Sequence, residues 1–280
     1  MQALAPPRLL APVVRRTVQA VRAAQAGAEG EVITYRPDLT QGSSEWMAAR
    51  CGLLTASEMK LIITPTMKIA SNDKERAHLY ELLAQRITRY VEPAYVSDAM
   101  LRGMDDEIEA VAQYGKTYAP VKPVGFVTND KWGFTIGYSP DGLVGDDGQV
   151  ECKSRSQKYQ IQTLCDYVAV DTIDPDFMIQ VQTGLLVTER SWCDLVSYSG
   201  GLPMATVRVF PEENIQAAII DAATAFEARL VVKMLKYESV LASNARLIPT
   251  ERKIYEEMFS RNEDDSKFFT NEHLKGGIPL

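Results

Sequence analysis

Four long stretches of the chain repeat apolar residues at the spacing of one helix face, and each is predicted to form an amphipathic helix. They are residues 72–90, residues 98–118 behind a Ser97 cap, a segment that starts at Asp174-Pro175, and residues 211–241. In the second of these helices, the positions expected to face inward are Met100, Met104, Ile108 and Val111.

Short β-like runs separate these helices. The turn pair Asn129-Asp130 joins residues 122–128 to residues 131–138, and these runs form a predicted meander with residues 143–144 and 149–153. Two more strands are expected at 191–199 and 205–210. This pattern predicts an α/β fold, with a central mixed sheet of about five strands flanked by helices on both sides.

The last hairpin of the meander brings charged residues together. Its Gly-Asp-Asp-Gly run at 145–148 predicts a four-residue loop. Successive strand side chains point to opposite faces, so Glu151 and Lys153 share a face while Cys152 points away. Folding the hairpin brings Asp141 opposite Glu151. The sequence therefore predicts two carboxylates and one ammonium at the end of a short sheet.

Two carboxylates in one small site repel each other, and a hard divalent cation is a suitable partner for both. Asp141 and Glu151 are candidate ligands of Mg²⁺, or of Mn²⁺ in its place, with the Cys152 carbonyl within reach. Lys153 is placed to orient a water or to stabilise a phosphate during in-line displacement. The alternative is a solvated hairpin in which Glu151 and Lys153 form a surface ion pair of little energetic value.

A phosphate site is predicted upstream of the meander. Ser43 or Ser44 caps a short helix that carries Arg50, and Ser57 is expected to cap a second helix directly after it. A helix N-terminus with a hydroxyl and a nearby arginine is suited to bind an anion. The alternative is a pair of capped helices with a surface arginine.

Three further polar features are candidates for the same site. Glu107 borders the apolar stripe of its helix, where a metal would supply a partner and contact with water is the alternative. Gln180 and Gln182 interrupt the helix that starts at Asp174, and the sequence leaves open which of them faces the site. The basic run at 154–159 suits either DNA backbone contacts or a solvated loop.

Composition narrows the chemistry. The chain has 280 residues, a net charge of −7, four cysteines and two histidines. The scattered cysteines contain no C-x-x-C pair, and two histidines leave little room for a histidine-rich metal site or a Ser-His-Asp triad. No run of about eighteen apolar residues occurs, so no membrane span is expected. The acidic net charge argues against a simple DNA-coating protein, although it permits an enzyme with a locally basic channel.

The ends of the chain differ from its middle. Residues 1–35 are an arginine-rich N-terminal extension that is expected to be poorly ordered, with an organelle transit peptide as the alternative. Residues 36–242 are expected to form the main domain, and residues 243–280 a polar C-terminal tail.

A family resemblance rests on the hairpin. Pro140-Asp141, nine intervening residues and Glu151-Cys152-Lys153 resemble the core motif of the PD-(D/E)XK nucleases. The string Ser-Pro-Asp-Gly-Leu at 139–143 resembles one branch in particular, the phage lambda exonuclease and YqaJ-type viral recombinase family, and the likeness covers roughly residues 41–198. The resemblance implies a restriction-endonuclease-like core in which Asp141, Glu151 and Lys153 are catalytic.

The same resemblance implies roles for other residues. Arg50 and Ser57 would bind a 5′-terminal phosphate, Glu107 would add a metal-site carboxylate, and one of the two glutamines would lie at the site. The implied activity is Mg²⁺-dependent exonucleolytic digestion of linear duplex DNA from 5′ ends, which leaves 3′ tails for a phage annealing protein. Family members form ring-shaped trimers, and a phage or prophage origin implies a cytoplasmic location in a bacterial host.

Two other functions remain open from the sequence. One is an endonuclease or another DNA nuclease on the same core, such as a short-strand nuclease, in which Arg50 would not recognise a 5′-phosphate. The other is a non-catalytic DNA-binding or phage-structural protein that kept the fold, although the intact Asp141, Glu151 and Lys153 argue against it.

Overall fold

The structure is a computed structural model that describes residues 33–93 and 97–252. The chain divides into two units, residues 1–237 and residues 238–280, and the first unit contains both sheets. The described part of the second unit completes the last helix and continues without strands to Arg252. Most of the predicted N-terminal extension and C-terminal tail lies outside the described residues.

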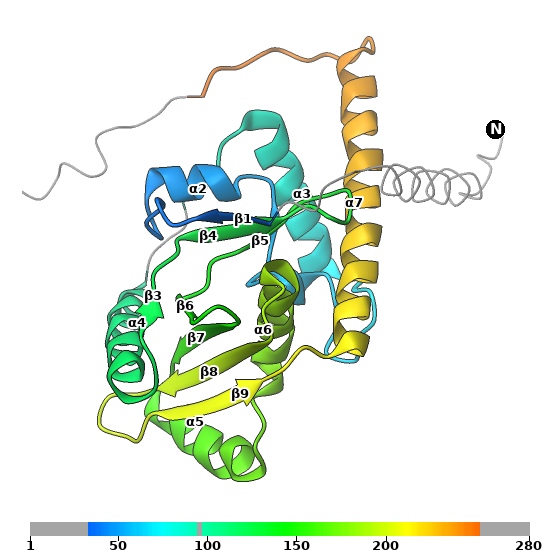
Figure 1. The fold of residues 1–280 in the computed structure, drawn as a ribbon. Coiled ribbons are helices and arrows are strands. Elements are labelled where there is room, and N and C mark those ends of the chain that lie inside the picture. Colours follow the sequence, from blue (N-terminus) through cyan, green and yellow to red (C-terminus); the bar gives the residue numbers. More distant parts are fainter. Residues whose placement is uncertain (1–32, 94–96, 253–280) are drawn as a thin grey trace, which may run out of the picture. The chain divides into compact units, whose positions relative to one another are not determined.

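Two sheets form the centre of the first unit (Figure 1). The larger has the order β3-β6-β7-β8-β9, with β7 and β8 parallel and the other pairs antiparallel. The smaller has the order β1-β4-β5-β2, with β2 and β5 parallel. The strands are β1 Ile33–Arg36, β2 Leu54–Thr55, β3 Val121–Lys122, β4 Phe126–Asn129, β5 Ile136–Tyr138, β6 Gly142–Val144, β7 Gly148–Ser154, β8 Trp192–Tyr198 and β9 Ala205–Val209.

The long helices begin close to their predicted first residues. Side chains of Ser43, Asn72, Ser97 and Asp174 each accept a backbone N–H in the first turn that follows. The α-helices are α2 Ser44–Arg50, α3 Asp73–Thr88, α4 Asp98–Thr117, α5 Gln157–Gln162, α6 Pro175–Thr188 and α7 Glu213–Leu241. Shorter turns are η1 Met59–Leu61, η2 Thr163–Tyr167 and η3 Val168–Val170. No helix in the described part of the chain is long and apolar enough to cross a membrane.

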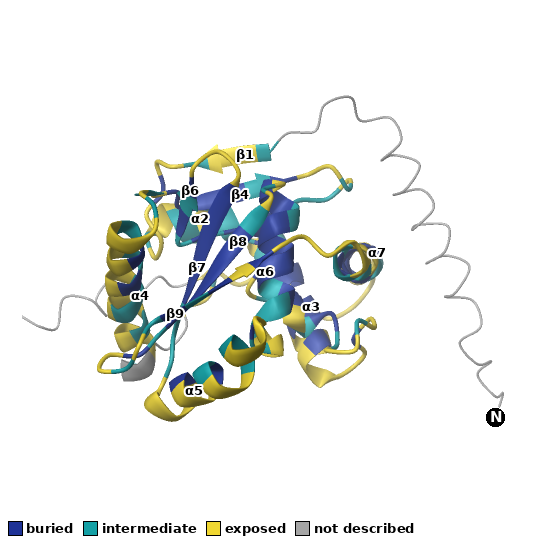
Figure 2. Cartoon of the chain, turned by 60° about the horizontal axis from the view of Figure 1, so that its bottom comes forward, coloured by how far each residue is buried: buried dark blue, intermediate teal, exposed yellow. Residues whose placement is uncertain are grey.

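Helices α4 and α6 cover opposite faces of the five-stranded sheet (Figures 1 and 2). Tyr114 of α4 packs in one apolar cluster with Val196 of β8, whereas Leu185 of α6 packs in another with Leu195. Neighbouring strand residues point to opposite faces, so these two contacts lie on different sides of the sheet. The predicted α/β fold, with helices on both sides of a mixed sheet, is confirmed.

The predicted meander is divided between the two sheets. The prediction of a single strand over residues 122–128 is wrong, because β3 and β4 are separate strands that pair in different sheets. Pro123 lacks the N–H that a continuing ladder needs. At Gly125 the chain passes so close to Leu39 that a Cβ would lie 2.0 Å from the Leu39 carbonyl oxygen. The break therefore sends the chain into a second sheet rather than extending the first.

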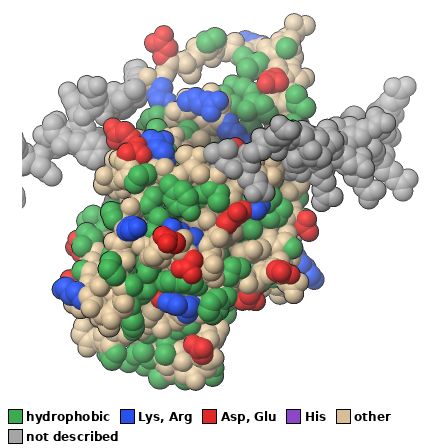
Figure 3. All heavy atoms as spheres, viewed as in Figure 1, with side chains coloured by type: hydrophobic (Ala, Val, Ile, Leu, Met, Phe, Trp, Pro, Cys, Tyr) green, Lys and Arg blue, Asp and Glu red, His purple; other side chains and the backbone are tan. Residues whose placement is uncertain are grey.

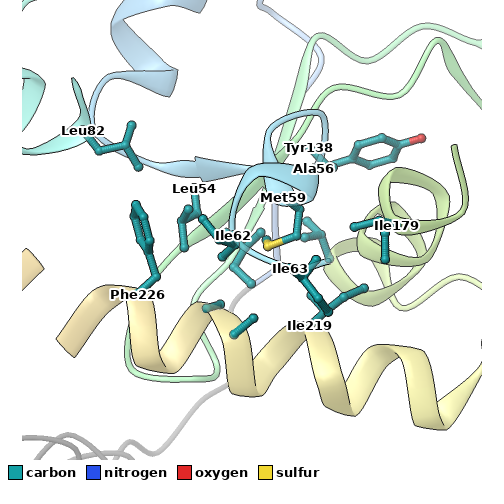
Figure 4. Close-up of a cluster of buried hydrophobic side chains, with 14 of the residues drawn as sticks. Leu54, Ala56, Met59, Ile62, Ile63, Leu82, Tyr138, Ile179, Ile219 and Phe226 are labelled. Atoms are coloured by element: carbon teal, nitrogen blue, oxygen red, sulfur yellow. The ribbon is translucent and has the colours of Figure 1, made fainter. Parts of the chain in front are cut away.

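The main core lies between the four-stranded sheet and the helices α3, α6 and α7 (Figure 4). Ile219 and Phe226 of α7 are fully buried in it, together with Leu54 and Met59. Helices α3 and α7 are also joined by a bidentate ion pair at the edge of this core, in which Arg86 donates to both carboxylate oxygens of Glu227 at 2.6 and 2.7 Å. The smaller sheet is thereby held against two long helices.

Candidate active site

Strand pairing brings the two predicted carboxylates together. β6 and β7 are antiparallel, with Gly142 opposite Val150, so Asp141 and Glu151 are the next pair along. The backbone N–H of Cys152 donates to Asp141 Oδ2 at 2.5 Å, which holds this carboxylate against β7. The sequence prediction that Asp141 lies opposite Glu151 agrees with this register.

The hairpin loop is one residue shorter than predicted. Gly148 already pairs with Val144, so the loop contains residues 145–147 only. Gly145 adopts a φ of +57°, a conformation in which glycine has no Cβ penalty. The shorter loop leaves the facing of the β7 side chains unchanged, because the register is set by the Gly142–Val150 pair.

Glu151 is held by three donors from three elements. Its Oε1 accepts from Lys153 Nζ at 2.6 Å and also from Gln180 Nε2, and its Oε2 accepts from the Tyr138 hydroxyl at 2.7 Å. The carboxylate is buried, with 2% of the residue exposed. Sequence analysis missed Tyr138, which precedes the Ser-Pro-Asp-Gly-Leu string and belongs to β5 of the other sheet.

One hollow of about 170 Å³ collects the predicted site residues from several elements. Its lining includes Arg50, Ser57, Glu107, Asp141, Glu151, Lys153 and Gln180. The first and the last of these residues in the sequence, Arg50 and Gln180, are 130 positions apart. The structure thus brings together the two groups that the sequence could only treat separately, the candidate metal centre and the candidate phosphate site.

The charges in this hollow are unevenly balanced. Burial raises the pKa of Asp141 well above its ordinary value, and the negative charges of Glu151 and Glu107 raise it further. Burial likewise raises the pKa of Glu107, although Lys153 opposes that shift. Burial alone would lower the pKa of Lys153, but Glu151 and Asp141 outweigh it and raise that pKa. Lys153 is therefore a stable cation among three acidic groups.

These donors suit a hard divalent cation. Among residues 33–93 and 97–252, no three His, Cys, Asp or Glu side chains form a group of the kind that encloses a metal, so Glu107, Asp141 and Glu151 line the hollow without making a closed cage. Mg²⁺ does not need such a cage, because it commonly keeps several waters and binds through one or two carboxylates. Burial raises the pKa of Asp141, and the negative charges of Glu151 and Glu107 raise it further; a bound cation would offset that negative charge.

Arg50 lies at the C-terminal end of α2 and is largely enclosed. Its guanidinium stacks 4.3 Å from the ring centroid of Trp46, and its Nη2 donates to Thr55 Oγ1 at 3.3 Å. The Trp46 indole N–H donates to Ser139 Oγ at 2.9 Å, which ties α2 to the turn just before Asp141. Burial lowers the pKa of Arg50, and Glu58 opposes the shift. α2 thus aims a stacked arginine at the hollow.

Ser57 does not cap a helix, and that prediction is wrong. The segment after it forms only the three-residue 3₁₀ turn η1, whose first flanking residue is Glu58 and which has no side-chain cap. Thr55 Oγ1 donates to the Glu58 carboxylate at 2.5 Å, so the polar groups here bond to one another rather than to a helix start. Ser57 is nevertheless exposed and lines the hollow beside Arg50.

Most of the apolar stripe predicted to face inward on α4 is exposed instead, and of its four residues only Val111 packs against the sheet (Figure 2). Met104 and Ile108 are 51% and 71% exposed, because α4 packs on the sheet through Ala110 and Tyr114. Glu107 is partly buried and borders both the hollow described above and an adjoining one of about 410 Å³. The carboxylate reaches the site even though the stripe beside it does not form core.

The two glutamines of α6 have different surroundings. Gln180 donates to Glu151 and lines the hollow. Gln182 is fully buried elsewhere, where its Nε2 donates to the Phe210 carbonyl at 2.8 Å and its Oε1 accepts from the Glu212 N–H at 2.9 Å. Gln182 therefore holds the approach to α7, and only Gln180 faces the candidate site.

The basic run after β7 is partly structural. Arg155 pairs with Asp174 at 2.8 Å and stacks 4.9 Å from the Phe177 ring, while Lys158 stacks 4.5 Å from the Tyr159 ring. The run continues into α5 rather than forming a loop. Basic and acidic side chains are also interspersed on the face of the molecule shown in Figure 3, so that face has no large patch of one charge.

Comparison with known proteins agrees with this geometry. No curated protein matches the chain. The chain is similar to LHK-Exo, an alkaline exonuclease from Laribacter hongkongensis, with 31% identity and a TM-score of 0.62 over 72% of this chain and 100% of that one. A second structure of LHK-Exo, in complex with dAMP, matches equally well. The profile of the YqaJ-like viral recombinase domain matches residues 45–191, and the chain belongs to that family.

Proposed function

We propose that this protein is a Mg²⁺-dependent 5′→3′ exodeoxyribonuclease that shortens one strand of linear duplex DNA and leaves 3′ single-stranded tails. The observation that supports it most directly is that Arg50 and Ser57 line the same hollow as Asp141, Glu151 and Lys153. A phosphate-binding arginine beside a hydrolytic centre fits cleavage at a short, fixed distance from a strand end.

Asp141 and Glu151 are the proposed ligands of the cation, with the Cys152 carbonyl as a third oxygen and Glu107 as a further carboxylate. Mn²⁺ is proposed to substitute for Mg²⁺, since both accept hard oxygen donors. When bound, the cation neutralises charge on the scissile phosphate and lowers the pKa of a coordinated water. The acidic surplus around Asp141 supports this assignment.

Lys153 is proposed to stabilise the charge that develops on the phosphate. Its side chain is 19% exposed, and its ammonium is bonded to Glu151 and held in its charged form by the surrounding carboxylates. In the reaction the oxygen of a water forms a bond to phosphorus and the bond to the 3′-oxygen breaks. The 3′-oxygen takes a proton and leaves as the hydroxyl of the released mononucleotide. A fixed positive charge near the phosphate lowers the barrier because it needs no reorganisation.

Arg50 and Ser57 are proposed to hold the 5′-phosphate at the strand end. Each cleavage leaves a new phosphate on the shortened strand, so the same pair would receive the next end after every step. The structure of the similar LHK-Exo with dAMP supports nucleotides of DNA as the ligand class. A guanidinium suits this role, because it forms charge-assisted hydrogen bonds with phosphate oxygens.

An endonuclease without recognition of a 5′-phosphate is the second candidate. The observation that favours it is that Arg50 already has intramolecular partners, the Trp46 ring and the Thr55 hydroxyl. In that case the arginine would serve to hold α2 in place, and substrate ends would be irrelevant.

Substrate topology separates these candidates. We expect rapid, Mg²⁺-dependent release of mononucleotides from 5′-phosphorylated linear duplex, and no cleavage of a covalently closed circle of the same sequence. The Asp141→Asn variant is the control for a contaminating nuclease. Cleavage of the circle at a comparable rate would favour the endonuclease, and no Mg²⁺-dependent cleavage of either DNA would contradict nuclease function.

The family also leads us to propose a homotrimer, a single-strand annealing protein as partner in phage-type recombination, and action in the cytoplasm of a bacterial host. Light scattering of the purified full chain tests the first of these. A monomer at micromolar concentration would contradict it.

A further inference from the structure

Tyr138 contacts the candidate metal site from the opposite sheet. It ends β5 of the four-stranded sheet, whereas Glu151 lies on β7 of the five-stranded sheet. Its hydroxyl donates to Glu151 Oε2 at 2.7 Å, and the two residues are 1% and 2% exposed. A buried neutral donor thus bridges the sheets at a proposed metal ligand.

The ring of Tyr138 occupies a slot that α6 provides. Its apolar edge belongs to the main core, and its hydroxyl points away from the neighbouring apolar side chains (Figure 4). Gly184 leaves the room for the ring, since a Cβ there would lie 2.7 Å from Tyr138 Cζ. Gln180 is four residues earlier on the same helix, so one face of α6 contacts the tyrosine and also supplies a donor to Glu151. Through Gly184 and Gln180, α6 therefore positions two donors, the Tyr138 hydroxyl and the Gln180 amide, on the Glu151 carboxylate.

Tyr138 differs from the other donors in a way that matters for a cation. The terminal torsion of a glutamate is broad, so the carboxylate rotates unless both oxygens are held. Lys153 and Gln180 both bond to Oε1, and Tyr138 is the donor that the structure places on Oε2. A phenol hydroxyl carries no positive charge, so it fixes the carboxylate without repelling a metal ion.

We propose that Tyr138, seated against Gly184, is a positioning residue that fixes the orientation in which Glu151 binds the divalent cation. This inference rests on the proposed metal site. Partners that orient a metal ligand typically contribute about 10- to 100-fold to metal affinity.

The test is Mn²⁺ binding to the full chain without DNA, measured by titration calorimetry. We expect Tyr138→Phe to weaken Mn²⁺ binding by about tenfold, because the ring stays and only the hydroxyl is lost. Tyr114→Phe is the matched control. Tyr114 is equally buried and donates to the buried Asp194 at 2.6 Å, yet its partner lies on the other face of the sheet. This control should leave Mn²⁺ affinity unchanged.

Gly184→Ala gives a second variant that keeps the hydroxyl and displaces the ring, and it should also weaken Mn²⁺ binding. Circular dichroism and thermal unfolding of the metal-free variants identify any that fail to fold. Parental affinity in folded Tyr138→Phe and Gly184→Ala would overturn the inference, as would an equal loss in Tyr114→Phe. A parent chain that binds no Mn²⁺ would instead overturn the proposed metal site itself, and the positioning role with it.

Discussion

Replacing Arg50 tests whether the enzyme recognises strand ends. The guanidinium is stacked on Trp46 and lines the hollow that contains Asp141, so it is placed to meet a phosphate beside the cleavage centre. A hydrogen bond to a charged group contributes about 1.5–3 kcal/mol. The Arg50→Ala variant should therefore degrade 5′-phosphorylated duplex about 10- to 100-fold more slowly than the parent, since each 1.4 kcal/mol is a factor of ten.

The assay compares initial rates on two linear duplexes that differ only in the 5′ end. Ends with a 5′-hydroxyl lack the charged group, so the parent should start on them slowly and Arg50→Ala should change that rate little. Arg50→Lys keeps the charge but not the two-pronged donor geometry, and it should fall between the parent and the alanine variant.

Arg36→Ala is the matched control for loss of one positive charge, because the Arg36 side chain is 44% exposed, pairs with Asp38 and does not line the hollow. It should behave like the parent on both duplexes. If Arg50→Ala slowed both kinds of end equally, the arginine would serve only to hold α2 against Trp46. The endonuclease would then be the better account.

Three further predictions follow from the same contacts. The Asp141→Asn variant should lose cleavage and yet have a higher Tm than the parent in EDTA at neutral pH. A carboxyl whose pKa is raised by folding stabilises the folded state below that pKa, and this stabilisation is lost as the pH rises through it. Each 1 kcal/mol of stability changes the Tm by about 2–4 °C. Lys153→Met should lower kcat by about 10²-fold or more while duplex binding persists. Single-turnover rates and a separate binding assay measure the two quantities, and an unchanged kcat would contradict the role of Lys153. Gln180→Ala should reduce cleavage with little change in Tm. Gln182→Ala should instead destabilise the fold by about 1–3 kcal/mol and leave kcat per folded molecule unchanged. Denaturant unfolding and kinetics of both variants test this, and the opposite pattern would contradict it.

The parts of the site that the sequence predicts are those fixed by one hairpin. The facing of Glu151 and Lys153 depends on strand alternation, and the approach of Asp141 depends on a register that the turn sets locally. Arg50 is predicted with its helix because Ser43 or Ser44 marks the helix start, and the structure shows that Ser43 is the cap. None of these steps needs knowledge of a distant partner.

The errors arise where a distant partner decides the outcome. On α4 the periodicity identifies an apolar stripe, but the sheet is packed by Ala110 and Tyr114, and the stripe through Met104 stays exposed. Ser57 precedes a helix-like sequence that ends after one 3₁₀ turn. A chain with two sheets cannot be distinguished from one long meander by alternation alone, because both repeat every second residue.

Tyr138 and Gln182 show the same limit for polar residues. Gln180 and Gln182 are two positions apart on one helix, so they face different directions, yet only the docking of β9 and α7 decides which direction is the site. Tyr138 looks like an ordinary strand residue in the sequence. Its proposed role depends on Glu151, 13 residues away in the other sheet, and no local pattern indicates that contact.

The site therefore lies where the two sheets meet, and its alignment depends on a small number of bridging hydrogen bonds. Trp46 donates to Ser139 Oγ, Gln41 donates to the Pro140 carbonyl at 3.1 Å, and Tyr138 donates to Glu151. Each such bond contributes only about 1 kcal/mol to the stability of the fold. A misplacement of about 1 Å between a bound substrate and the reacting groups, however, can slow a reaction by about 10²-fold. Because Arg50, Ser57 and Tyr138 come from one side of the hollow and Glu151 of β7 comes from the other, we expect these hydrogen bonds to affect catalysis more than folding.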